Sequence, residues 1–198
     1  MSNINVAKFL MNSEIEGPGT RFVIWFQGCN INCNGCSNQE LIPLEPKYFI
    51  PTSLLFEKIL EAKEEFCIEG VTLLGGEPFL QPDALLELTN FCKANDLTVI
   101  CFTGYIYEKL NLEYQNILSN IDILIDGPFL IKQLDYKRRL IGSKNQRVIK
   151  LTEFYKDCDY FEKPHSEIEI QLYNNRLSMN GDGVVFDNEF GEFKFKIN

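Results

Sequence analysis

Three cysteines lie close together in the chain at the spacing C-x3-C-x2-C, at Cys29, Cys33 and Cys36. Cysteine thiolates are the usual ligands of iron–sulfur clusters. Each iron of a cubane [4Fe-4S] cluster takes one protein ligand, so three local cysteines leave one iron of the cluster without a protein ligand. The spacing therefore predicts a cluster with one iron open for chemistry.

Zinc is the alternative metal. A structural zinc ion takes about four ligands, usually as two separated pairs. None of the remaining candidates is paired at C-x2-C or H-x3-H spacing; they are Cys67, Cys92, Cys101, Cys158 and His165. The spacing favours a cluster over zinc, and we expect the other four cysteines to be small apolar residues of the core.

Composition indicates the setting of the protein. A chain of 198 residues with 45% hydrophobic content has enough material for one substantial core. We expect one domain at residues 1–155 and a β-rich extension at residues 156–198 packed on it. The formal net charge of −9 argues against nucleic acid as a partner, and Lys137-Arg138-Arg139 is the single basic patch in the sequence.

Cysteine usage and apolar run length bear on the compartment. An odd number of cysteines, seven, without a paired framework suits a reducing environment. Apolar runs such as residues 121–125 are too short to span a bilayer, and the first residues lack a basic region of the kind that opens a secretory signal. We expect a cytoplasmic protein with no membrane partner.

Strand and helix patterns alternate along most of the chain. Apolar runs at residues 22–26, 71–74, 97–102 and 121–125 read as strands, and a further strand-like run covers residues 148–151. We expect Thr52 or Ser53 to cap a helix that carries an apolar stripe of Leu55, Ile59, Ala62 and Phe66. Pro82 is placed to open a second helix, and a third helical stretch lies around residues 107–118. Strands that are apolar on both sides need cover on both faces, which predicts an α/β fold with mostly parallel strands.

Polar and glycine-rich motifs follow four of these strands. The motifs are Cys29, Gly75-Gly76-Glu77, Thr103-Gly104 and Asp126-Gly127. In parallel α/β sheets and barrels the carboxyl ends of the strands meet at one rim, where ligands bind. We therefore expect the four motifs to share one site.

The cysteine loop, followed one strand later by Gly75-Gly76-Glu77-Pro78, resembles the radical S-adenosylmethionine superfamily. Three more segments resemble the activating proteins of anaerobic ribonucleotide reductase, a group of glycyl-radical enzyme activases: residues 16–21, 126–129 and 142–147. The residues Asn34-Gly35 before Cys36 suit this group too. The similarity covers about residues 14–150.

This resemblance implies a partial (βα) barrel of the radical S-adenosylmethionine type. Cys29, Cys33 and Cys36 would hold a [4Fe-4S] cluster, and S-adenosylmethionine would chelate the fourth iron. Reductive cleavage would give a 5′-deoxyadenosyl radical, which would abstract hydrogen from a glycine of a partner such as anaerobic ribonucleotide reductase. A flavodoxin or ferredoxin would supply the electron. The protein would thus be an oxidoreductase that binds metal and works anaerobically.

The resemblance also assigns a cofactor-binding role to five residues at the rim. Gly75 and Gly76 would let the backbone approach S-adenosylmethionine, and oxygens near Glu77 would accept from its ammonium group. Thr103 would donate a hydrogen bond, and Asp126 would bind the cation. A tight turn at the glycines, an ordinary strand end at Thr103 and a capping role for Asp126 are the structural alternatives.

Other polar residues and the C-terminal segment carry weaker signals. Glu16 and Arg21, beside a Gly-Pro-Gly turn, and Asn145, Gln146 and Arg147 would brace the rim or shape a partner surface, or form solvated loops. From residue 167 polar and apolar residues alternate, and Asn174-Asn175 reads as a turn, which predicts a small antiparallel β appendage. We expect it to cover a sheet edge, bind the partner or mediate dimerisation.

Two other functions stay open at this point. A radical S-adenosylmethionine enzyme acting on a peptide or a small molecule fits the same motifs. A non-enzymatic, metal-binding interaction module would use the cysteine loop only for stability.

Overall fold

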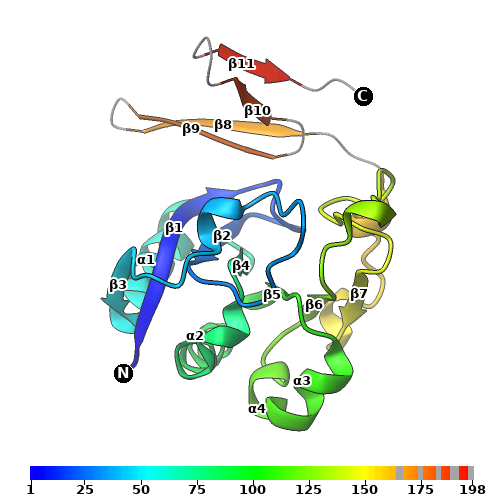
Figure 1. Ribbon diagram of the computed structural model, residues 1–198. Coiled ribbons are helices and arrows are strands. Elements are labelled where there is room, and N and C mark those ends of the chain that lie inside the picture. The colour runs from blue at the N-terminus through cyan, green and yellow to red at the C-terminus, as the bar shows by residue number, and fades with distance from the viewer. Residues whose placement is uncertain (164–166, 174–175, 182–183, 188–191, 196–198) are drawn as a thin grey trace.

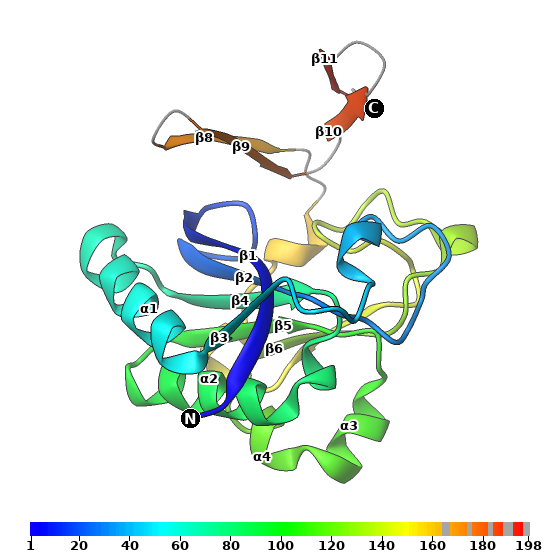
Figure 2. The same cartoon turned by 60° about the vertical axis from the view of Figure 1, so that its left-hand side comes forward.

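The computed structural model describes residues 1–163, 167–173, 176–181, 184–187 and 192–195. Seven strands form one sheet in the order β3-β1-β2-β4-β5-β6-β7 (Figure 1). The strands are β1 (Asn3–Ser13), β2 (Arg21–Phe26), β3 (Tyr48–Pro51), β4 (Gly70–Gly75), β5 (Thr98–Phe102), β6 (Ile123–Asp126) and β7 (Arg147–Lys150). The helices are α1 (Thr52–Phe66), α2 (Pro82–Ala94), α3 (Tyr107–Glu113) and α4 (Gln115–Leu118), and they cover one face of the sheet (Figure 2).

The centre of the sheet is parallel, and its edges are antiparallel. Strands β2, β4, β5 and β6 are parallel neighbours, with Phe26 opposite Gly75 and Phe102 opposite Ile125. Antiparallel β1 and β3 extend one side, and antiparallel β7 extends the other. The sheet stays open, since β3 and β7 are its two edges. The predicted α/β fold with parallel strands is confirmed, and the parallel register aligns the carboxyl ends of four strands.

Both faces of the central strands are buried. Every residue of β2 is buried, and its side chains alternate between two clusters. Phe22, Ile24 and Phe26 join the main core under the helices, whereas Val23 and Trp25 pack on the opposite face. A strand covered on both sides gains from apolar residues at every position. The continuous apolar run at residues 22–26 therefore forms a central strand, as predicted.

Helix α1 presents the predicted stripe, with Leu55, Ile59 and Ala62 fully buried. The expectation that Thr52 or Ser53 caps this helix is wrong, because Pro51 is the N-cap and Thr52 is the first helical residue. The Thr52 hydroxyl instead donates to Oε2 of Glu87 in α2, at 2.6 Å. This bond ties α1 to its neighbouring helix.

Helix α2 begins at Pro82, as predicted, and buries Leu85, Leu88 and Cys92. The predicted helical stretch at residues 107–118 forms two short helices, α3 and α4, which are separated at Tyr114.

A second core lies on the face of the sheet away from the helices. Ile100, Ile123 and Ile125 of β5 and β6 meet Tyr155 and Phe161 there. Phe161 lies beyond residue 155 in the chain and is only 2% exposed. The segment after β7 therefore folds back over the sheet and contributes to its core.

The C-terminal segment forms two antiparallel pairs. Strands β8 (Ile168–Tyr173) and β9 (Arg176–Gly181) pair with each other, as do β10 (Val184–Asp187) and β11 (Glu192–Phe195). The β8–β9 pair lies over the connection between β1 and β2 (Figures 1 and 2), where the Glu14 amide donates to Glu169 Oε1 at 3.1 Å. The predicted antiparallel appendage is confirmed, while its expected turn at Asn174-Asn175 lies outside the described residues.

Candidate functional site

The three cysteines lie in a loop that leaves the carboxyl end of β2. Backbone bonds close the base of this loop, from Gly28 N to Leu41 O at 2.9 Å and from Cys29 N to Ile42 O at 3.1 Å. Gly28 has a φ of +96°, a conformation that favours glycine because it has no Cβ. Cys29, Cys33 and Cys36 are all half-buried free thiols.

The end of β4 packs directly on the base of the cysteine loop. The Gly76 amide donates to Phe26 O at 2.8 Å, and the Glu77 amide donates to Gly28 O, also at 2.8 Å. A Cβ on Gly76 would lie only 2.2 Å from the carbonyl oxygen of Gly28. Glycine at position 76 is therefore required for the close approach of two backbone segments.

Glu77 joins the ends of β4 and β5 from a buried position, with 1% of its surface exposed. Its Oε1 accepts from Phe79 N at 3.0 Å and from the Thr103 hydroxyl at 2.8 Å, and its Oε2 accepts from Gly104 N at 2.8 Å. Burial raises the pKa of Glu77 to about 7, although the three hydrogen bonds favour the carboxylate. The Glu77 side chain thus fixes the segment after β4 relative to the segment after β5.

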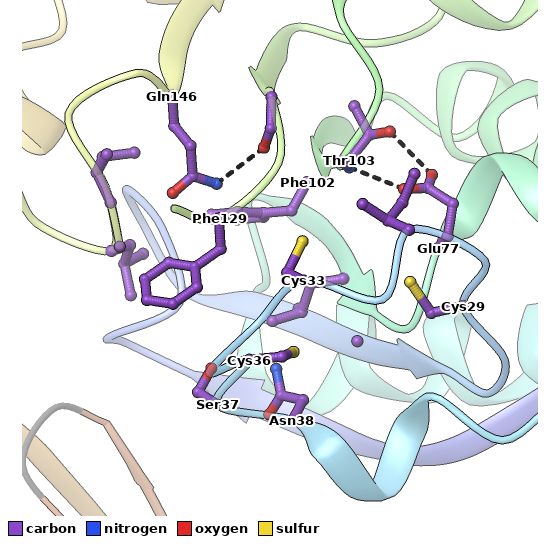
Figure 3. A pocket seen from close by; sticks show the side chains of 18 of the residues that line it. Cys29, Cys33, Cys36, Ser37, Asn38, Glu77, Phe102, Thr103, Phe129 and Gln146 are labelled. Carbon is purple, nitrogen blue, oxygen red and sulfur yellow. Dashed lines mark hydrogen bonds between the residues drawn. The ribbon is translucent and has the colours of Figure 1, made fainter. Parts of the chain in front are cut away.

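A cavity of about 820 Å³ opens beside these groups, within the range of roughly 300–1,000 Å³ typical of small-molecule sites. Its wall includes residues of four rim motifs: the three cysteines, Gly75-Gly76-Glu77, Thr103-Gly104 and Gly127. Figure 3 shows the cysteines on one loop, with the Glu77–Thr103 pair on the neighbouring strand ends. The structure therefore brings seven of the eight predicted site residues to one cavity.

Asp126 is the predicted site residue that does not line the cavity. Its carboxylate is 1% exposed, and it accepts from Tyr107 N at 2.7 Å and from Arg147 Nε at 2.9 Å. Arg147 also donates to both carboxylate oxygens of Glu108. Asp126 thus accepts a hydrogen bond from the first amide of α3 and forms an ion pair with Arg147 of β7, which matches the capping alternative. The next residue, Gly127, borders the cavity.

The residues of the cysteine loop fit an iron–sulfur cluster. Cys29, Cys33 and Cys36 are thiols on one loop, and each can bind a different iron of the same cluster. The half-buried thiols, on a loop bordering a cavity large enough for a second ligand, match the cluster's requirement.

Hydrogen bonds from the backbone support the thiolate forms that such a cluster needs. Burial raises the pKa values of Cys29 and Cys33 above their ordinary value. Backbone hydrogen bonds from Ile31 and Asn32 to Cys29, and from Phe129 to Cys33, offset part of this rise in pKa. Amides that favour a thiolate also stabilise cluster sulfurs, so the protein already supplies part of the cluster's polar surroundings.

Arg21 lies at the amino end of β2, at the opposite end of the strands from the cysteine loop. Its guanidinium is fully buried and donates to Thr72 Oγ1 at 2.8 Å, to Val71 O at 2.8 Å and to Tyr155 OH at 3.1 Å. The expectation that Arg21 braces the carboxyl rim or a partner surface is wrong, because these partners fix the amino ends of the strands. Glu16 does reach the cavity wall.

The other cysteines differ from one another. Cys92 and Cys101 are buried, as expected, and Cys158 is half-buried. Cys67 is exposed, so the expectation that it belongs to the core is wrong. It follows the last residue of α1 with a φ of +51°, which turns the chain out of the helix and its side chain towards solvent.

Sequence reasoning missed part of one wall of the cavity. Residues between β6 and β7 line this wall, among them Phe129, Tyr136, Arg138, Leu140 and Gln146. The resemblance had marked the segments that contain Phe129 and Gln146, but Tyr136, Arg138 and Leu140 follow neither a helical nor a strand period and were not expected at the site. The basic run Lys137-Arg138-Arg139 was the available signal.

The parallel-centred α/β sheet and the cysteine-bearing rim define an iron–sulfur protein of the radical S-adenosylmethionine class. The chain belongs to the family described as "4Fe-4S single cluster domain", whose model matches residues 15–149. Both the predicted resemblance and the predicted cofactors, a [4Fe-4S] cluster and S-adenosylmethionine, are thereby confirmed.

Two relatives with curated names are activating proteins. The chain is 32% identical over 144 residues to the anaerobic ribonucleoside-triphosphate reductase-activating protein of Vibrio cholerae, a match that covers 70% of this chain and 92% of that one. It is 33% identical over 114 residues to the pyruvate formate-lyase-activating enzyme of Clostridium pasteurianum, covering 56% of this chain and 46% of that enzyme. The chain therefore spans nearly all of the first relative and about half of the second.

Among solved structures, QueE from Escherichia coli matches with a TM-score of 0.41 and 13% identity, covering 66% of this chain and 73% of that one. In the described part of the present chain, no helix combines the length and apolar character that a bilayer crossing requires.

Proposed function

We propose that this protein installs a glycyl radical on a partner enzyme of the anaerobic ribonucleoside-triphosphate reductase type. The observation that carries the proposal is the meeting of the C-x3-C-x2-C loop and Gly75-Gly76-Glu77 at one cavity. The relatives support the choice of partner. The match covers 92% and 96% of two activating proteins of that reductase, but only 46% of a pyruvate formate-lyase-activating enzyme.

The three cysteines hold the cluster in this proposal, and the rim motifs hold S-adenosylmethionine beside it. When bound, the cluster supplies the electron that cleaves S-adenosylmethionine. Gly75 and Gly76 present backbone without a Cβ at the cavity wall, so a ligand can approach closely. The residues from Gly75 to Glu77 offer carbonyl oxygens for an ammonium group, and Glu77 keeps this segment fixed to β5 through Thr103 and Gly104.

Asp126 acts from behind the rim in this proposal. Its bonds to Tyr107 and Arg147 fix the start of α3 and the beginning of β7. Gly127, the residue that follows, borders the cavity, so the position of this wall depends on Asp126. We assign Asp126 to the cofactor site as a positioning residue.

We also propose that residues 1–155 and 156–198 work as one unit. The Tyr160 hydroxyl donates to Ile15 O at 3.2 Å, and Arg139 forms an ion pair with Glu167. Phe161 packs in the second core of the sheet. These contacts support an extension that is packed on the catalytic domain, with residues up to 163 continuing that domain.

A reconstitution experiment tests the chemistry. The protein is loaded anaerobically with iron and sulfide, and 5′-deoxyadenosine is measured after addition of dithionite and S-adenosylmethionine. We expect Cys33→Ser to abolish cluster formation and cleavage, and Cys67→Ser to preserve both, because Cys67 lies on the exposed end of α1. Uptake of zinc alone, or full cleavage by Cys33→Ser, would overturn the proposal.

A second experiment tests the partner. The reduced, loaded protein is mixed with S-adenosylmethionine and the anaerobic ribonucleoside-triphosphate reductase of the same genome, and the radical is sought by electron paramagnetic resonance. We expect a glycyl radical that disappears when the candidate glycine of the reductase is replaced by alanine. Cleavage of S-adenosylmethionine without any radical on the reductase would favour a different substrate, such as a small molecule.

A further inference from the structure

One wall of the cavity is a long loop with a surface of its own. We call residues 127–146, which connect β6 to β7, the strap. The strap runs beside the cysteine loop in both views (Figures 1 and 2). A Cβ on Gly35 would lie 2.6 Å from Cδ1 of Ile131, so the strap packs against the cysteine loop at this glycine. Phe129, Tyr136 and Leu140 continue from this contact along the cavity.

The strap is held in shape by its own polar side chains. Asp135 accepts from Lys137 N at 2.9 Å and from Arg138 Nε at 2.8 Å. Arg138 in turn donates to Gln146 O at 2.9 Å, and Ser143 Oγ accepts from Leu130 N at 3.1 Å. A loop that is already ordered loses little conformational entropy when it binds a partner.

The strap is strongly basic within an acidic chain. It contains five lysine and arginine residues and one acidic residue, Asp135, whereas the whole chain carries a net charge of −9. Arg138 and Arg139 are engaged within the protein, with Asp135 and Glu167 respectively. The remaining three cations are exposed and form no ion pair with the described carboxylates: Lys132, Lys137 and Lys144.

Apolar side chains are exposed on the same strap. Leu130 is 38% exposed, Ile131 45% and Tyr136 75%. Tyr136 also lines the cavity, so this surface runs without a break into the proposed site. Exposed aromatic and aliphatic residues surrounded by unpaired charges are typical of a protein-binding surface.

We propose that the strap is the docking surface for an acidic segment of the activated enzyme, next to the loop that carries its glycine. This proposal rests on the proposed function. The lysines would attract the acidic segment, and Tyr136 and Ile131 would pack against it. Because the strap is a wall of the cavity, a chain held there leads into the cavity. That continuity favours the substrate protein over an electron donor, which needs only to come near the cluster.

A charge-reversal variant tests the docking surface. Lys132→Glu, Lys137→Glu and Lys144→Glu are combined, and a control reverses three exposed lysines outside the strap, Lys47, Lys93 and Lys156. Binding of each loaded protein to the reductase of the same genome is measured at 50 and 200 mM NaCl. We expect the strap variant to lose about tenfold in affinity at low salt and to lose most of its salt dependence, while the control keeps both.

The dithionite-driven cleavage of S-adenosylmethionine, without reductase, separates the possible failures. We expect all variants to cleave at the wild-type rate, which also shows that they are folded. Lys→Gln substitutions at the three strap positions provide a milder version, with a smaller loss of affinity. If the wild type cleaves and the strap variant binds the reductase normally, the docking surface is refuted while the activity stands.

Two further outcomes are decisive. If the strap variant binds the reductase normally but loses activation only when flavodoxin or ferredoxin replaces dithionite, the strap serves the electron donor and the inference is wrong. If the wild type itself fails to cleave S-adenosylmethionine, the proposed function is refuted. Normal cleavage with unchanged reductase binding by the strap variant refutes only the docking surface, so the two failures can be told apart.

Discussion

Thr103, directly after β5, donates its hydroxyl hydrogen to Oε1 of Glu77, beyond the end of β4, across 2.8 Å. Both residues line the cavity, and both are almost completely buried. The pair means that the Gly75-Gly76-Glu77 segment is positioned by the neighbouring strand and not by its own turn alone.

Removing the hydroxyl at position 103 tests this link. We expect Thr103→Val to destabilise the apo protein by about 2 kcal/mol, because a buried carboxylate loses a donor. Thr103→Ser should recover most of that loss, since it retains the hydroxyl. Urea unfolding monitored by fluorescence gives the free energies. Equal stability of the valine and serine variants would show that the hydrogen bond contributes little.

The pH dependence of stability provides a test of Glu77. Its folded pKa of about 7 lies above the ordinary value of 4.5, so the folded state binds the proton more tightly than the unfolded state. The contribution of Glu77 to stability is therefore fully present below pH 4.5 and is lost as the pH rises towards 7. We expect Glu77→Gln to remove this decline. Urea unfolding of the apo protein from pH 4.5 to 8 measures it, and parallel curves for wild type and variant would contradict it.

Two glycines of the rim form a matched pair for testing backbone contact. A Cβ at Gly76 would lie 2.2 Å from a backbone oxygen of Gly28, whereas a Cβ at Gly104 would meet only the side chain of Ile31, at 2.8 Å. The Ile31 side chain can rotate away, but the Gly28 carbonyl belongs to the closed base of the cysteine loop. We expect Gly76→Ala to lower the iron content after reconstitution at least fivefold and Gly104→Ala to lower it less than twofold. Similar iron contents in both variants would argue against this difference.

The pair formed by Asp126 and Arg147 predicts an energetic coupling. Hydrogen bonds to Asp126 and Glu108 raise the pKa of Arg147, so the guanidinium stays charged at any pH of interest. We expect Asp126→Asn and Arg147→Met each to destabilise the protein, and their double variant to cost less than the sum by about 1–3 kcal/mol. A double-mutant cycle measured by urea unfolding gives this coupling energy. Additive effects would mean that each residue acts independently.

Much of the central fold was predictable from the sequence, for a physical reason. Strands covered on both faces must be apolar throughout, and residues 22–26 and 121–125 therefore stand out from the helices around them. The glycine and polar residues after each strand marked the rim in the same way. Because these strands are parallel, the motifs that follow them must lie together at the carboxyl ends of the strands.

The edges of the sheet and the strap were less accessible to sequence reasoning. Strand β1 mixes polar residues such as Lys8 and Asn12 into an eleven-residue strand with irregular register, so its alternation is broken. The orientation of Asp126 depends on Arg147, twenty-one positions away in the chain. Interactions between distant residues of this kind leave no local pattern. The same holds for the strap, whose shape comes from side-chain hydrogen bonds.

The burial of Arg21 at the amino ends of the strands has a consequence for how this protein tolerates change. Its guanidinium donates hydrogen bonds to residues of β4 and β5 and to the Tyr155 hydroxyl. One side chain of β2 therefore holds three strands and the segment after β7 together at the end of the strands away from the cavity. Structural integrity and chemistry therefore reside at opposite ends of the same strands. Natural variation or laboratory evolution can remodel the strap and the rim for a new partner while the fastening at Arg21 keeps the scaffold intact.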